Sequence, residues 1–97
     1  MSKWRMKSIK HSGTCGERGT ERQEPYYLAR KNCLVEFLIT NLEIGKPARL
    51  YYSPLEENHG NGILTSLVID YRWHKENEED IFVIETQNSI FSMKLLE

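Results

Sequence analysis

The chain has few of the residues that build redox or metal centres. Its two cysteines, Cys15 and Cys33, stand too far apart for a CxxC redox motif or a zinc knuckle. The three histidines, His11, His59 and His74, are scattered, whereas a metal site needs convergent ligands. We therefore expect no metal and no cofactor. Cys33 is expected to be a small, buried, reduced thiol.

Long apolar runs are also absent. No stretch approaches the roughly 20 residues that a membrane-spanning helix needs. The N-terminus is basic but lacks the apolar segment of a secretory signal. No Ser–His–Asp or Cys–His arrangement has local support in the sequence. We therefore expect a cytoplasmic protein with no membrane partner and no enzymatic activity.

The 97 residues suffice for one domain with one modest core, but their charge is unevenly distributed. Residues 1–32 carry eight Lys/Arg against three Glu, and residues 33–97 carry five Lys/Arg against eleven Asp/Glu. Such a basic segment can bind nucleic acid, or it can lie on an acidic body. The second interpretation is favoured. The candidate basic residues are Lys3, Arg5, Lys7 and Lys10.

The first 24 residues are predicted to form a basic flexible arm, followed by a single small β-barrel domain over residues 25–97. Gly13–Gln23 is rich in glycine and poor in apolar residues, so we expect it to be mobile. Three apolar residues in the arm would be a liability if exposed. These residues, which we expect to dock on the barrel or on a partner subunit, are Trp4, Met6 and Ile9. The alternation of Trp4 and Met6 also allows a short edge strand over residues 3–9.

The segment after the arm allows two interpretations. One helical stripe contains Leu34, Phe37, Leu38 and Leu42. Gly45 and Pro47 then supply a stop signal. Together they favour a helix near residues 33–43. The alternative is a strand over residues 33–39, in which every second residue is apolar: Cys33, Val35, Phe37 and Ile39.

Alternating apolar residues predict strands in the rest of the chain. The runs are Ala48–Ser53, Gly62–Trp73, Ile81–Thr86 and Ser89–Leu96. The longest run should bend, so that each half serves a different part of the core. Gln87 and Asn88 should form the tip of the last hairpin. The predicted fold class is mainly β (α+β): one helix followed by a bent antiparallel sheet of four or five strands.

Three short segments carry a resemblance to a known group of folds. They are Ile44-Gly-Lys-Pro-Ala-Arg-Leu50, Leu64-Thr-Ser-Leu-Val68 and Glu85-Thr-Gln-Asn-Ser-Ile-Phe91. Over about residues 42–95 the chain resembles small SH3-like barrel proteins of bacteria and mobile gene cassettes. Phe91 stands where that pattern usually has Tyr. The resemblance implies an SH3-like barrel and transfers no catalytic residue.

Aromatic and arginine side chains form the most credible binding surface in the sequence. Arg49, Tyr51, Arg72 and Trp73 are the candidates. Such a set suits protein contact, a homodimer interface or stacking on single-stranded bases. Four hydroxyl residues should also meet if their strands pair, and they are more simply explained as partners of backbone groups. These residues are Thr65, Ser66, Thr86 and Ser89.

The functional hypothesis that follows is a non-enzymatic binding or adaptor module. It is expected to self-associate as a homodimer and to be an accessory protein of a mobile element or bacterial genome. The alternative is a nucleic-acid-binding protein that uses the basic arm and the Arg/Tyr surface.

Overall fold

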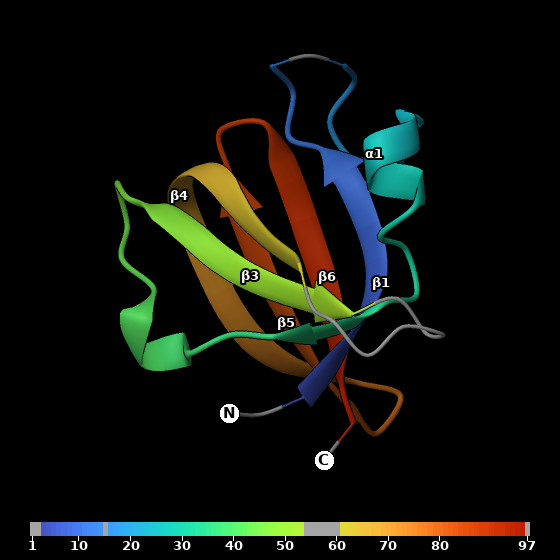
Figure 1. Ribbon diagram of the computed structural model, residues 1–97, viewed down its shortest axis with the longest axis vertical. Helices are drawn as coiled ribbons and strands as arrows, with labels where there is room; N and C mark the ends of the chain where they lie inside the picture. The colour runs from blue at the N-terminus through green and yellow to red at the C-terminus, as the bar shows by residue number, and fades with distance from the viewer. Residues whose placement is uncertain (1–2, 15, 54–60, 97) are drawn as a thin grey trace.

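The computed structural model describes residues 3–14, 16–53 and 61–96. Within these ranges, six antiparallel strands form a closed barrel in sequence order, with the last strand returning to the first (Figure 1). The strands are β1 (Lys3–His11), β2 (Leu34–Glu36), β3 (Pro47–Ser53), β4 (Asn61–Glu76), β5 (Glu79–Thr86) and β6 (Ser89–Leu95). A four-residue helix, α1 (Pro25–Leu28), and a 3-10 turn, η1 (Ile39–Asn41), lie between strands. The prediction of a mainly β barrel is confirmed.

Strand β1 closes the barrel. It pairs with β2 through Lys3, Trp4 and Arg5, and it pairs with β6 along nearly its whole length. The residues expected to dock, Trp4, Met6 and Ile9, are all buried. Residues 3–11 are therefore part of the barrel, although they were expected to belong to an arm outside it. The apolar alternation decides this, because those side chains complete the core. Mobility of Gly13–Gln23 stays a prediction.

The predicted helix near residues 33–43 is wrong. This segment forms strand β2 and then η1. Val35 pairs with Trp4 on one side and with Tyr52 on the other, so β2 bridges β1 and β3. Leu38, which the helical stripe would have buried, is 46% exposed. Strand pairing on both sides outweighs the local helical pattern. The alternative strand is thus correct for Leu34–Glu36.

Strand β4 is long and bent, as the sequence predicts. Its first half pairs with β3 and its second half with β5, and the register shifts between Val68 and Asp70. Figure 1 shows the strand curving past β3 toward the back of the barrel. Asn77 and Glu78 then turn the chain tightly into β5, both with positive φ. Such a pair is typical of a two-residue hairpin whose twist matches the strands.

An aromatic cluster around Trp4 fills one end of the core. The Trp4 ring lies 5.6 Å from Phe37, 5.2 Å from Trp73 and 5.6 Å from Phe82, measured between ring centroids. Trp4 is fully buried, whereas Trp73 is 48% exposed. Aromatic pairs at these distances stabilise a protein beyond the contribution of the apolar area that they bury. Trp4 therefore connects β1 to β4 and β5 across the interior.

Cys33 is buried at the start of β2, as the sequence predicts. Its Sγ donates a hydrogen bond to the carbonyl oxygen of Ala29 at 3.3 Å. Burial raises the pKa of the thiol above its ordinary value, so it stays protonated at neutral pH. Cys15 lies outside the described residues.

Replacing Trp4 by alanine should destabilise the protein severely. We expect a loss of about 3–5 kcal/mol in the free energy of unfolding, because the change leaves a large cavity among the aromatic rings. Urea denaturation measures the loss. The control is Leu64→Ala on the surface of β4, which should change the free energy by less than about 0.5 kcal/mol. Equal losses in the two variants would contradict the central role of Trp4.

Candidate binding surfaces

The four predicted surface residues do not come together. Arg49 and Tyr51 lie on β3, opposite Leu64 and Gly62 in the first half of β4. Arg72 and Trp73 lie in the second half of β4, opposite β5. The two latter side chains also point to opposite faces, because adjacent strand residues alternate. The single surface expected from the sequence is therefore divided between separate regions of the barrel.

The first region is a groove between η1 and β3, with a volume of about 590 Å³. Its most exposed apolar side chain is Leu64, at 63%. Lys46 and Arg49 give the groove positive charge, and Lys46 pairs with Glu43 at 2.8 Å. The remaining lining residues are Leu38, Asn41, Leu42, Pro47 and Tyr51. The groove is thus a mainly apolar surface with two cations.

The second region is the free edge of β4. Strand β3 pairs with β4 only as far as Leu67, and Val68 then bonds to the turn at Gly45 and Lys46. From Ile69 to Glu76, no described strand pairs with this edge. Three large side chains along it are 37–48% exposed: Ile69, Tyr71 and Trp73. This stretch offers both unpaired backbone groups and apolar side chains.

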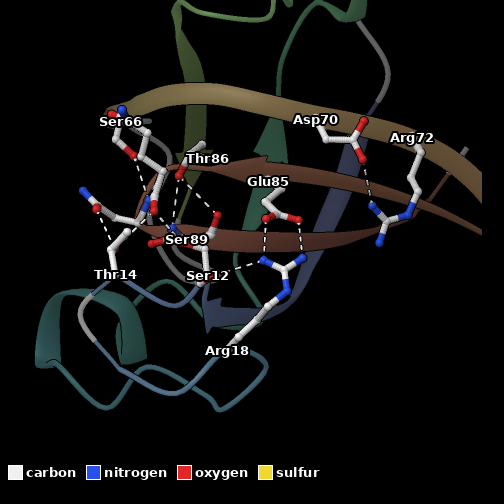
Figure 2. Close-up of polar contacts among 11 residues, drawn as sticks. Ser12, Thr14, Arg18, Ser66, Asp70, Arg72, Glu85, Thr86 and Ser89 are labelled. Carbon is white, nitrogen blue, oxygen red and sulfur yellow. Dashed lines mark hydrogen bonds and ion pairs between the residues drawn. The ribbon is translucent and has the colours of Figure 1, made fainter.

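The hydroxyl residues do meet, as the sequence predicts. Thr65, Ser66, Thr86 and Ser89 line a small pocket of about 190 Å³ beside α1. Thr86 accepts a hydrogen bond from the backbone N–H of Ser89, and Thr65 accepts one from the backbone N–H of Ala48. Ser66 accepts a weaker one from Asn88 (Figure 2). These bonds satisfy the backbone at a hairpin and a bend, which supports the structural interpretation of the cluster.

A buried arginine next to this pocket was missed by the sequence analysis. Arg22 is only 8% exposed and donates from Nη1 to the carbonyl oxygen of Asn88 and to Oγ of Ser89, each at 2.9 Å. Its Nε donates to Glu24 at 2.9 Å, and its guanidinium lies 4.4 Å from the centre of the Tyr27 ring. The arginine therefore fastens the segment before α1 to the β5–β6 hairpin. The glycine-rich sequence around it gave no signal of this role.

A second ion pair ties the loop after β1 to the outer face of β5. Arg18 donates to both carboxylate oxygens of Glu85, at 2.5 and 2.7 Å (Figure 2). The Glu85 side chain is 8% exposed. The hydrogen bonds from Arg18 hold the pKa of Glu85 below its ordinary value, against the effect of burial. This two-point contact joins Arg18 of the loop to the barrel.

The cations expected in a basic arm instead lie along β1. Lys3 and Lys7 are exposed, and Arg5 and Lys10 are half-buried. Arg5 donates to the carbonyl oxygen of Asn32 at 2.8 Å. The structure thus places the four residues on a rigid strand and gives them fixed positions relative to one another.

The described residues contain no group of three or more side chains suited to bind a metal ion. His11 and His74 lie on β1 and β4, while His59 falls outside the described residues. The expected absence of metal, cofactor and enzymatic activity stays a prediction. No helix among the described residues is long and apolar enough to cross a membrane.

Comparisons with protein-family models, curated proteins and solved structures found no match to this chain.

The Arg18–Glu85 pair should make stability depend on pH. Because the pKa of Glu85 is lowered in the folded state, the pair stabilises the protein above the ordinary value of 4.5, and this stabilisation is lost as the pH falls through the lowered value. Arg18→Met should therefore lower the urea midpoint at pH 7 and have a progressively smaller effect in acid. Lys46→Met, which breaks an exposed pair with Glu43, is the control. A pH-independent difference between wild type and Arg18→Met would contradict the assignment.

Proposed function

We propose that this protein is a non-enzymatic binding module that self-associates through the free edge of β4. The observation that carries the proposal is the stretch from Ile69 to Glu76, which pairs with β5 along one edge and has no described strand partner along the other. An open edge of this kind is a template for another strand. A second copy of the same chain is the partner that we infer, because two such edges can pair antiparallel about a twofold axis.

Three side chains support this choice of partner. Ile69, Tyr71 and Trp73 are large and apolar, and 37–48% of each is exposed. Covering each half-exposed side chain would contribute about 1 kcal/mol, so that six of them contribute about 6 kcal/mol in a symmetric dimer. Backbone hydrogen bonds across the edge add to this sum. Association costs offset much of it, so we expect a weak dimer whose population depends on protein concentration.

Charged side chains at the end of this edge oppose the addition of further strands. Lys75 and Glu76 follow the apolar residues, and charged side chains at a strand edge oppose continuous sheet growth. A twofold dimer uses the edge once and leaves no second copy of it to extend. A discrete dimer is therefore favoured over a fibre.

The resemblance to SH3-like barrels and the cytoplasmic location belong to this proposal as expectations. A small closed barrel is compatible with that resemblance. An adaptor in the cytoplasm, serving a mobile element or a bacterial genome, would need an exposed surface for its partners. The groove beside η1 is available for such contacts when the β4 edge is occupied by a second copy.

The variant Ile69→Lys should convert the dimer into a monomer. A lysine at the bulge of β4 places a charge in the proposed apolar contact, and we expect at least a tenfold weaker association, or about 1.4 kcal/mol. Sedimentation velocity across a wide range of concentrations measures the change. Thermal midpoints of both proteins would show that the variant remains folded.

The matched control is Leu64→Lys. It introduces the same charge on the same strand, at a more exposed position where β3 already covers the edge. This variant should associate as the wild type does. A wild-type chain that stays monomeric at every concentration would sink the proposal, as would equal weakening by the two variants.

A further inference from the structure

We propose that the outer face of β1 binds the phosphate backbone of a double-stranded nucleic acid. The proposal centres on β1 and does not depend on self-association, although the depression beside β1 extends to Arg72 and His74 in the second half of β4. It rests on the arrangement of four cations along one strand, on the shape of the face around them and on the partners of the neighbouring acidic groups.

A bulge in β1 places the cations on one face. Met6 pairs with Met93 and Ser8 pairs with Ser92, so an advance of two residues along β1 matches an advance of one residue along β6. The inward positions therefore change from Trp4 and Met6 to Ile9, all of which are buried. The outward positions are Lys3, Arg5, Lys7, Ser8 and Lys10.

The bulge matters because strict alternation would put Lys10 on the same face as Trp4 and Met6. Shifting the register by one residue reverses every later side chain. With the bulge, Ile9 enters the core and Lys10 joins Lys7 on the outside. Four of the five outward residues of this strand are consequently cationic.

The face around these residues is hollowed. A depression of about 490 Å³ runs from β1 across β6 and β5 to β4. Its floor contains Ile81 and Val83, which are buried although they point away from the barrel interior. Lys7 and Lys10 stand at one side, and Arg72 and His74 stand at the other. Arg72 pairs with Asp70, and His74 lies beside Glu76, so the uncompensated positive charge lies on the β1 side. A convex polyanion can therefore lie in the depression against the cations of β1.

Three acidic side chains near this face lie beside basic groups outside β1, and Glu36 lies opposite Lys3 on β2. Glu21 pairs with Lys31 at 3.1 Å, and Glu85 pairs with Arg18. On β4, Glu76 lies 3.5 Å from His74. Among the described residues, none of these acids forms an ion pair with a β1 cation. Lys7 and Lys10 are therefore available to an external anion, while Arg5 also donates to the carbonyl oxygen of Asn32.

The dimensions suit a nucleic-acid backbone. From Lys3 to Lys10 the strand covers roughly 23 Å at about 3.3 Å per residue. One strand of a duplex carries about seven phosphates over that length, at 3.4 Å each. The depression has no Phe, Tyr or Trp among its described lining residues, so no stacking platform for single-stranded bases is present there. Backbone contact with a duplex, independent of sequence, is the mode that this face supports.

Binding to a mixed-sequence duplex of about two helical turns, measured by fluorescence anisotropy over a salt series, tests the proposal. Four phosphate contacts predict a slope of log affinity against log salt of about −3.6, or roughly a 150-fold loss between 50 and 200 mM salt. The double variant Lys7→Glu, Lys10→Glu should reduce binding at least 50-fold at low salt. The affinity of the neutral double variant Lys7→Gln, Lys10→Gln should lie between the affinities of the wild type and the glutamate variant. Its slope of log affinity against log salt should be closer to −1.8.

The matched control is Lys46→Glu, Arg49→Glu, which makes the same change in net charge at the groove beside η1. It should retain wild-type affinity for the duplex. Thermal midpoints of all variants check that the barrel remains folded. Equal losses in the β1 and groove variants would overturn the proposal.

The proposal also fails if the wild type binds no duplex at low salt. Tighter binding to a single strand of the same length would contradict the duplex assignment. Binding to vesicles that contain anionic lipid, without binding to the duplex, would identify a membrane surface instead and overturn the proposal.

Discussion

The packing of Trp4 at the closure of the barrel is the interaction on which the rest of the structure depends. Trp4 lies in the strand that joins β2 to β6, and its ring contacts aromatic residues of the β2 segment, β4 and β5. Without that strand, β2 would lose one of its two partners and β6 would become an edge. Closure removes those edges and buries the ring in one step. Strand β1 is therefore as necessary for the closed barrel as strand β6.

This closure also determines what remains on the surface. Because the apolar residues of β1 point inward, its cations are held outside on a rigid strand. Because β3 pairs with only the first half of β4, the second half keeps an open edge with exposed apolar side chains. Basic and apolar surfaces thus arise from one arrangement of strands. The cations are carried by β1 and the exposed apolar side chains by β4, within a barrel of fewer than 100 residues.

Alternation of apolar residues was the most reliable signal in the sequence. It identified β3 to β6, and it identified the docking of Trp4, Met6 and Ile9. The predicted run Ile81–Thr86 is β5, which lies between β4 and β6 with all residues from Ile81 to Thr86 buried. The helical stripe from Leu34 to Leu42 led to a wrong prediction of a helix. In so short a segment, the helical repeat of 3.6 residues and the strand repeat of two residues place many of the same positions on one face.

The sequence by itself determined that Trp4, Met6 and Ile9 are buried, since the removal of apolar side chains from water depends on composition and periodicity. It also determined the hairpin tip at Gln87 and Asn88. Only the tertiary structure decided that Leu34–Glu36 becomes a strand and that Lys10 points outward. It likewise decided that Arg22 and Arg18 hold the loop after β1 against β5 and β6. These outcomes depend on pairing, register and contacts between segments distant in the chain, which local periodicity does not encode.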